Sequence, residues 1–303
     1  MHKPMQKTEH GPAADIKMSF ELFPPKTEQG LRNLDETVDR LAALNPEYFS
    51  VTYGAGGTTR DRTRGVVTRV AKRTGLPVAH HLTCVNASRA EVETQARELW
   101  AAGVRKLVAL RGDPPDGGVF EPRPDGYPCA ADLVEALMAI GDFDIRVACH
   151  PEVHPDAVSA DSDLDNLKRK LDAGATRAIT QYCFDTEQIL RFVDKARARG
   201  IDKPIIPGIM PVFHVAKLKR FSETCGATMP DWLLEMFDGL DDDPATRAMV
   251  ATAVATEQCS RLIDAGFDEF HVYALNRSEL SVALARSLGI KDDAPAPSAV
   301  SAA

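Results

Sequence analysis

The stretch PVAHHLTCVNASRAEVETQARELWAAGVRKLVALR, residues 77–111, contains one complete strand–helix–strand unit. Residues 77–84 and 106–111 are apolar and rich in β-forming side chains, whereas residues 88–102 repeat apolar side chains at helical spacing. The helical pattern stops at Gly103, a common residue just past a helix end. Two strands that are joined through a helix run parallel, so this stretch predicts a βαβ crossover.

The same unit recurs eight times along the chain. The predicted strands are residues 16–23, 48–54, 77–84, 106–111, 145–150, 177–184, 204–210 and 269–275. The predicted helices are residues 31–44, 60–74, 88–102, 131–140, 164–173, 186–199, 216–224 and 245–265. Eight such units predict a single-domain α/β fold, a closed (β/α)8 TIM barrel over residues 16–290. An open doubly wound sheet is the alternative, weakened because no Gly-x-Gly-x-x-Gly pattern follows the first strand.

Outside this domain, the tails at 1–15 and 291–303 have compositions that predict disorder. Within it, residues 232–237 predict an extra helical turn, and the acidic run 241–243 before Pro244 suits the start of the last long helix.

Composition excludes several classes of protein. The 303 residues carry 36 basic and 44 acidic side chains, and a net charge of -8 gives no general attraction for nucleic acid. We expect no membrane association either, because no apolar run reaches the roughly 18 residues that a spanning helix needs. The six cysteines form no Cys-x-x-Cys pair, which predicts buried reduced thiols rather than disulfides. With no apolar stretch typical of a signal peptide in residues 1–15, we expect a cytoplasmic protein.

Polar side chains end nearly every predicted strand. In a parallel barrel these positions form the active-site rim. The candidates are Glu21, Thr52, Tyr53, His81, Thr83, Arg111, Asp113, His150, Glu152, His154, Gln181, Asn276 and Arg277. Each has an ordinary structural interpretation when it is taken alone: Glu21 as the partner of an internal arginine, or His81 as a satisfied core histidine. Their convergence at one rim predicts an enzyme.

Glu21 lies in SFELFPP, residues 19–25, among apolar neighbours. Desolvation there disfavours the charged carboxylate, so the sequence predicts that Glu21 is a proton donor.

Two histidine pairs raise the question of a metal. His80 and His81 are adjacent, and His150 and His154 are four residues apart in HPEVH. That segment follows a strand and has proline at its second position, so it is not the helical motif that places two imidazoles on one face. We therefore predict no catalytic metal.

The helical run that follows has two stripes. Leu164, Leu167 and Leu171 form an apolar one, while a polar one is made of Asp163, Asn166, Arg169 and Lys170. The pattern alone leaves two interpretations open. The polar stripe is either a solvated face with ion pairs, or a border of the barrel mouth that offers cations for phosphates and hydrogen bonds for a ribose or ring.

Taken in order, the motifs of this chain resemble those of the methylenetetrahydrofolate reductase family in its bacterial form. The motifs are SFELFPP at 19–25, VTYGA at 51–55, HLTC at 81–84, LRGD at 110–113, PEVHP at 151–155, NLKRK at 166–170, ITQ at 179–181, PGI at 207–209, MFDGL at 236–240 and LNR at 275–277. They span about residues 16–290, so the resemblance covers the whole predicted barrel.

The resemblance implies a (β/α)8 barrel that binds FAD noncovalently. It implies NAD(P)H-dependent reduction of 5,10-methylenetetrahydrofolate to 5-methyltetrahydrofolate by ping-pong hydride transfer through the flavin, which feeds methyl groups to methionine synthesis. It also implies a homo-oligomer. No ribose-recognition signature distinguishes NADH from NADPH in the sequence, and the bacterial relatives suggest NADH.

Site roles follow from the same resemblance. Glu21 matches the general acid that protonates N10 of the folate, and Asp113 a carboxylate that stabilises the developing cation. The substrate-binding positions are Gln181, Lys217, Phe221 and Arg277. The cofactor-binding positions are Thr52, Tyr53, Ala55, His81, Arg111, Gly112, Asp113, Ala130, His150, His154, Ala157, Asp163, Asn166, Arg169 and Lys170. Under the resemblance the polar stripe is therefore functional.

Three features depart from the family pattern. His150 replaces a tyrosine, Lys217 replaces a glutamine, and the loop 114–127 is longer. Two competing functions remain. One is another flavin-dependent barrel oxidoreductase, such as a proline dehydrogenase. The other is a folate-binding or storage protein without turnover, against which the retained Glu21, Asp113 and Gln181 argue.

Overall fold

A computed structural model of the protein describes residues 16–54, 60–114, 118 and 120–291. The predicted disordered tail 1–15, almost all of the tail 291–303 and the candidate Ala55 lie outside the described residues. The strands are β1 (Lys17–Leu22), β2 (Tyr48–Val51), β3 (Val78–Thr83), β4 (Lys106–Leu110), β5 (Asp144–Cys149), β6 (Arg177–Thr180), β7 (Ile205–Ile206), β8 (Gly208–Ile209) and β9 (Glu269–Tyr273).

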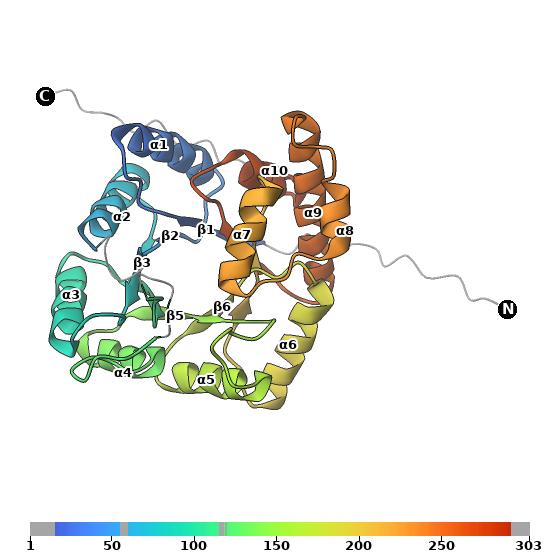
Figure 1. Cartoon of the computed structure of the whole chain (residues 1–303). Coiled ribbons are helices and arrows are strands. Elements are labelled where there is room, and N and C mark those ends of the chain that lie inside the picture. Colours follow the sequence, from blue (N-terminus) through green and yellow to red (C-terminus); the bar gives the residue numbers. More distant parts are fainter. Residues whose placement is uncertain (1–15, 55–59, 115–117, 119, 292–303) are drawn as a thin grey trace, which may run out of the picture.

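Helices surround these strands. They are α1 (Glu28–Ala42), α2 (Arg60–Thr74), α3 (Arg89–Ala101), α4 (Ala130–Ile140), α5 (Ala160–Asp172), α6 (Thr186–Ala198), α7 (Val215–Cys225), α8 (Asp231–Met236), α9 (Pro244–Asp264) and α10 (Glu279–Ser287). Figure 1 shows most of them following one another round the sheet in chain order, while α7 lies nearer the centre of the ring. Among the described residues, no helix is both long and apolar enough to span a membrane.

The strands form one parallel sheet that closes on itself, as predicted for a TIM barrel. The order is β7-β6-β5-β4-β3-β2-β1-β9-β8, and each pair of neighbours in this order is parallel. Because β7 and β8 are separated only by Pro207, the two ends of this order belong to one stretch of chain. The fold is therefore a single (β/α)8 barrel.

The seventh predicted strand, residues 204–210, is divided in two by hydrogen bonding. Pro207 has no N–H to donate, although its carbonyl accepts from the His271 amide at 3.0 Å. The next amide, that of Gly208, donates to the Thr180 hydroxyl at 2.9 Å instead of to a backbone carbonyl of β6. β7 consequently pairs with β6 and β8 with β9.

Helix starts follow their local sequence. Ser88 and Glu91 form a reciprocal capping box at the start of α3. Asp243 caps α9, whose first residue is Pro244, as the acidic run predicts. The predicted extra turn is present as α8.

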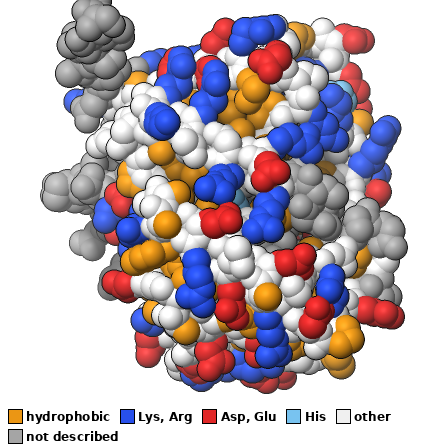
Figure 2. Space-filling view, turned by 90° about the vertical axis from the view of Figure 1, so that its left-hand side faces the viewer, with side chains coloured by type: hydrophobic (Ala, Val, Ile, Leu, Met, Phe, Trp, Pro, Cys, Tyr) orange, Lys and Arg blue, Asp and Glu red, His pale blue; other side chains and the backbone are white. Residues whose placement is uncertain are grey.

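Two large apolar clusters pack between the strands and the helices, one over β1, β2 and β9 and another over β3, β4 and β5. On the face shown in Figure 2, Lys and Arg side chains are interspersed with Asp and Glu, so that face presents no broad field of one sign.

Candidate active site

Glu21 lies near the end of β1 between two imidazoles. Its Oε2 is 3.4 Å from Nε2 of His81 on β3 and 3.5 Å from Nε2 of His271 on β9. The side chain is 19% exposed, whereas both histidines are buried. The structure thus brings the predicted Glu21 and His81 together and adds His271, which was not among the predicted site residues.

The electrostatics of Glu21 differ from the apolar surroundings expected of SFELFPP. Burial raises the pKa of Glu21, but a hydrogen bond from His271 and the charges of His81 and His271 lower it by more, so that the pKa lies below its ordinary 4.5. Burial lowers the pKa of His81 to about 4, against a smaller opposing effect from the Glu21 charge. The neighbours in sequence are apolar, yet the side chain points to polar groups on other strands.

A tight turn after β4 positions two further candidates. Gly112 has φ +85°, and a Cβ at this position would lie 2.6 Å from Cγ1 of Val85. On either side, Arg111 pairs with Asp156 at 2.8 Å, while Asp113 lies 3.9 Å from the same guanidinium and is 83% exposed. Asp113 is therefore an exposed carboxylate just past the carboxyl end of β4, at the limit of ion-pair distance from Arg111.

Glu21 and Asp113 act on the same neighbour. Burial, together with smaller effects of the Asp113 and Glu21 charges, raises the pKa of the Cys225 thiol at the end of α7 to about 11. Since both carboxylates affect one thiol, they belong to one region of the mouth.

The loop after β5 packs on the polar stripe of α5. The His154 amide donates to Oδ2 of Asp163 at 2.9 Å, and the buried ammonium of Lys170 donates to the Ala148 carbonyl on β5. Burial lowers the pKa of Lys170. The stripe therefore faces the barrel, which excludes the purely solvated interpretation for Asp163 and Lys170.

His150 and His154 meet edge to face, with ring centroids 4.6 Å apart. Burial lowers the pKa of His150 to about 3, helped by the charges of His154, Lys170 and Arg111, so its ring is neutral at pH 7. Nδ1 of His150 is buried and finds no hydrogen-bond partner among the described residues. Within that part of the chain, no three His, Cys, Asp or Glu side chains are placed to hold a metal ion.

An aromatic cluster supports α7 at the mouth. Phe221 is 47% exposed and stacks on Tyr182, with centroids 6.1 Å apart and planes at 17°. The Tyr182 hydroxyl lies 2.9 Å from the Ser222 hydroxyl, and Tyr273 packs edge-on against the same ring. This exposed ring on a fixed base suits stacking on a planar ligand.

The remaining candidates occupy the rim with fewer mutual contacts. Gln181 accepts from the Tyr182 amide at 3.0 Å, Arg277 lies 5.4 Å above the Phe213 ring, and Lys217 is exposed on α7. The other cofactor candidates hold these contacts: Thr52 donates its amide to Leu22, Tyr53 donates to Gln95, Asn166 accepts from Arg169, Ala157 donates to His154, and Ala130 begins α4.

Sequence reasoning overlooked the residues behind Glu21. Ser19, Tyr48 and His271 point into the barrel, but Ser19 and His271 lie inside their strands and Tyr48 begins β2, so none lies at the carboxyl end of a strand. The available signal was the alternation of Glu269, His271 and Tyr273 in the last strand, which marks a polar inner face.

The fold and this rim define a barrel protein whose acidic, cationic and aromatic groups converge at the carboxyl ends of its strands, the arrangement of a TIM-barrel enzyme. A model of the methylenetetrahydrofolate reductase family matches residues 6–289. The chain belongs to the methylenetetrahydrofolate reductase family.

Individual relatives agree with this membership. A 5,10-methylenetetrahydrofolate reductase of Pectobacterium carotovorum subsp. carotovorum is 49% identical over 279 residues, which cover 92% of each protein. The protein of the same name from Escherichia coli (strain K12) is 48% identical over 276 residues, 91% of this chain and 92% of that protein. Methylenetetrahydrofolate reductase (NADH) 1 of Arabidopsis thaliana is 36% identical over 94% of this chain, but only 50% of its own length is matched. These matches support methylenetetrahydrofolate reduction as the function.

One solved structure shows the same fold. It is described as an uncharacterized protein from Clostridium thermocellum that binds two copies of 5-methyl-5,6,7,8-tetrahydrofolic acid. It superposes with a TM-score of 0.61 at 14% identity, over 92% of this chain and 95% of that one. At this identity the likeness concerns architecture alone.

Proposed function

We propose that the protein reduces 5,10-methylenetetrahydrofolate to 5-methyltetrahydrofolate with NAD(P)H as reductant and a noncovalently bound FAD as hydride carrier. The observation that carries this proposal is the placement of Glu21 at the barrel mouth, in contact with His81 and His271 and in the same region as Asp113. A sheltered proton donor and a separate exposed carboxylate are the groups that opening a protonated aminal ring to a cation requires.

The residues at the mouth fit a flavin dinucleotide. His150 presents a buried ring nitrogen that has no hydrogen-bond partner within the described ranges, and Lys170 offers a buried ammonium whose charge acts on that ring. The guanidinium of Arg111 lies at the loop end, where it can meet a phosphate. A flavin bound there supplies the two-electron chemistry that carboxylates and imidazoles lack.

The protein's own groups then have distinct tasks. Glu21 gives a proton to N10 of the substrate, which opens the five-membered ring and leaves a cation at N5 and its methylene carbon. Asp113 offers negative charge to that cation, and Gln181 hydrogen-bonds the pterin. Phe221 stacks on the planar ligand, and Lys217 and Arg277 contact the folate beyond its ring.

The test separates the two halves of the reaction. In the wild-type protein, NADH or NADPH should bleach the bound flavin, and 5,10-methylenetetrahydrofolate should restore its oxidised spectrum. In Glu21→Gln, bleaching should proceed at the wild-type rate, while reoxidation by the folate falls by about 10²- to 10⁴-fold, the usual contribution of a general acid. Rapid-mixing absorbance measures both rates.

Glu28→Gln, at an exposed glutamate in the first turn of α1, serves as the matched control and should leave both halves unchanged. Equal losses in both halves of Glu21→Gln would contradict its role as proton donor. A flavin that NADH bleaches but the folate never reoxidises, in the wild-type protein, would indicate a different flavin-dependent oxidoreductase.

A further inference from the structure

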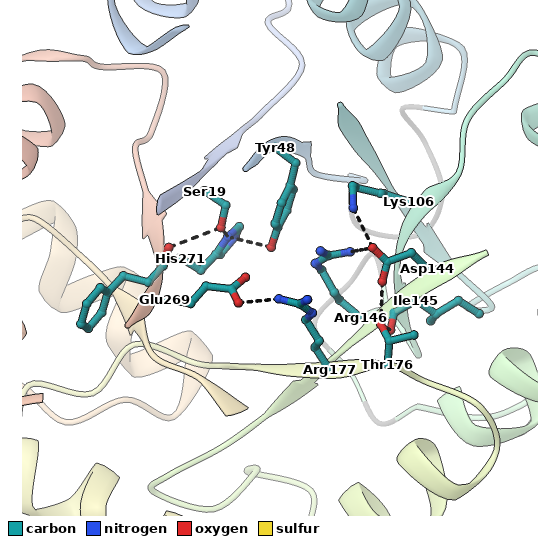
Figure 3. Close-up of polar contacts among 11 residues, drawn as sticks. Ser19, Tyr48, Lys106, Asp144, Ile145, Arg146, Thr176, Arg177, Glu269 and His271 are labelled. Atoms are coloured by element: carbon teal, nitrogen blue, oxygen red, sulfur yellow. Dashed lines mark hydrogen bonds and ion pairs between the residues drawn. The ribbon is translucent and has the colours of Figure 1, made fainter. Parts of the chain in front are cut away.

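A chain of polar groups that includes Ser19, Tyr48 and His271 lies inside the barrel (Figure 3), and Glu21 contacts it through His271. His271 is fully buried on β9, and its two ring nitrogens face different partners. Nε2 faces Oε2 of Glu21 at 3.5 Å, and Nδ1 lies 2.7 Å from the hydroxyl of Ser19. Ser19 and His271 are direct neighbours in the β1–β9 register, so strand pairing itself sets the shorter contact.

Ser19 indicates which nitrogen of His271 carries a proton. The Ser19 hydroxyl donates to the Phe270 carbonyl at 3.4 Å, so its oxygen is left to accept at the shorter 2.7 Å contact. We infer that the donor in that contact is Nδ1–H of His271, which also lies 3.4 Å from the Tyr48 hydroxyl. In the neutral ring of this tautomer, Nε2 is an acceptor and points its lone pair at Glu21.

Two acceptors therefore face each other across the Glu21–His271 contact. A neutral Nε2 and an ionised Oε2 repel, whereas one proton between them satisfies both. We propose that Glu21 and His271 hold one proton jointly, with Ser19 fixing the imidazole tautomer, and that His271 is the positioning residue that keeps this proton available to the general acid. The inference rests on the proposed function, because it concerns the proton that Glu21 delivers.

Of the two imidazoles at Glu21, only His271 suits this role. His81 is neutral at pH 7, because burial lowers its pKa to about 4, and its Nε2 has no hydrogen-bond partner among the described residues. His271 has a hydroxyl partner on its far nitrogen and can accept a second proton without leaving that nitrogen unsatisfied.

Other groups also surround His271. Tyr48 stacks on the imidazole with centroids 5.9 Å apart and planes at 18°, and Arg146 lies on the same tyrosine ring, 4.1 Å from its centroid. Arg146 pairs with Asp144 at 3.0 Å, which offsets its charge.

Tyr273 meets the imidazole of His271 edge-on at 5.6 Å, and Ser50 lies 3.5 Å from Nε2. Further along the barrel, Glu269 is paired with Arg177 (Figure 3). Glu21 is thus the carboxylate in direct contact with His271.

The proton balance is simple. One proton leaves the Glu21–His271 pair for N10 of the folate, whose C–N10 bond breaks, and the pair is left as a carboxylate beside a neutral imidazole. The hydride that completes the methyl group comes from NAD(P)H through the flavin. One proton from water then restores the pair, so each turnover consumes one proton and one hydride.

The first test requires neither substrate nor flavin turnover. Nitrogen NMR of ¹⁵N-histidine-labelled protein at pH 7 should show a resonance, assigned by its loss in His271→Gln, in which Nδ1 carries a proton. The Nε2 resonance of the same ring should change in Glu21→Gln, because its carboxylate partner is lost. A resonance that Glu21→Gln leaves unchanged, or an Nδ1 without a proton at pH 7, would overturn the proposal.

The second test is kinetic. In His271→Gln, folate-driven reoxidation of the flavin should slow at least 10-fold at pH 7.5 and recover as the pH falls, because a lone Glu21 must then take its proton directly from solvent. Reduction by NADH should be unchanged. Ser19→Ala should shift the same profile in the same direction by a smaller amount.

A loss that is equal at every pH would show a merely structural role and refute the proposal. Glu28→Gln, at an exposed residue of α1 outside the site, is the matched control and should leave the profile unmoved. Failure of the wild-type protein to be reoxidised by the folate would refute the proposed function, whereas the NMR spectra would still decide the pairing.

Discussion

Asn276 holds the end of β1 with both ends of its amide. Its Oδ1 accepts from the Phe23 amide at 2.9 Å, and its Nδ2 donates to the Phe23 carbonyl at 2.8 Å. The residue itself has φ +53°, a left-handed conformation that asparagine adopts more readily than most side chains. One residue thus joins the loop after β9 to the strand that carries Glu21.

Replacing the Asn276 side chain should weaken the attachment of the loop after β9 to the end of β1. Asn276→Gly retains the backbone freedom but loses both hydrogen bonds, so we expect the free energy of unfolding to fall by about 1–2 kcal/mol. Asn276→Asp keeps the acceptor for the Phe23 amide and should lose less. Urea titration followed by circular dichroism measures both, and a glycine variant as stable as the wild type would be inconsistent with this role.

Single residues were predictable where they end a strand and unpredictable where the decisive contact crosses the barrel. Glu21 and Asp113 could be named because they follow apolar runs. The polar environment of Glu21 could not, because its sequence neighbours are apolar and its partners come from β3 and β9. The pairing of distant strands determines which groups surround the Glu21 carboxylate. The sequence pattern does not show which residues of those strands lie side by side.

At the scale of elements, the turn after β4 shows how backbone geometry positions the rim. Gly112 and Gly103 share φ +85°, but their surroundings differ. A Cβ at Gly112 would lie 2.6 Å from Cγ1 of Val85 and 2.9 Å from Cβ of Thr83, whereas a Cβ at Gly103 would meet nothing within 4 Å. A comparison of Gly103 with Gly112 therefore separates the cost of the left-handed backbone conformation from the cost of a steric clash.

Alanine at the two positions should therefore have unequal costs. Gly103→Ala should lower the free energy of unfolding by about 1–2 kcal/mol, the cost of a left-handed alanine. Gly112→Ala should lose about 1–3 kcal/mol more, because Val85 and Thr83 must also shift. Under the proposed function it should also retain less flavin, since Arg111 and Asp113 flank the turn. Equal midpoints in urea for the two variants would show that the close contact relaxes freely.

Most elements were predictable from periodicity, capping residues and glycine, including α8 and the start of α9. The divided seventh strand was not. Its sequence reads as one continuous apolar run, and the break arises because Pro207 cannot donate and the Gly208 amide finds the Thr180 hydroxyl on β6. Composition alone does not reveal that a backbone amide donates to a side-chain hydroxyl instead of to a carbonyl of the neighbouring strand.

At the scale of the whole molecule, buried neutral histidines set the response to acid. Burial lowers the pKa of His80 to about 4, that of His81 to about 4 and that of His150 to about 3, each from an ordinary 6.5. The unfolded chain therefore takes up protons at a pH where the folded protein does not. Stability is complete above pH 6.5 and declines as the pH falls toward 4.

We expect the free energy of unfolding to fall by up to about 1.4 kcal/mol per pH unit for each such histidine between pH 6 and 4.5. His80→Leu removes one of the three and should flatten the slope by close to one proton, whatever its effect at pH 7. Urea titrations at several pH values measure the slope. An unchanged slope in this variant would mean that His80 is protonated in the folded state.

The closed ring itself was predictable, because eight repeats of one unit leave few alternatives. What was not predictable is how polar its interior is: Ser19, Tyr48, Arg146 and His271 fill positions that aliphatic side chains commonly occupy in such barrels. Inward and outward positions alternate along each strand, but single polar residues inside apolar runs look like surface residues until the strands are paired.

The contact between Ser19 and His271 joins residues 252 positions apart, and so it depends on the first and last strands of the ring lying side by side. During synthesis, β1 leaves the ribosome long before β9 exists. A nascent or truncated chain that lacks the last strand contains the acidic side chain without its imidazole neighbour. Under the proposed function, proton delivery therefore requires the final strand, and we expect incomplete chains to be inactive.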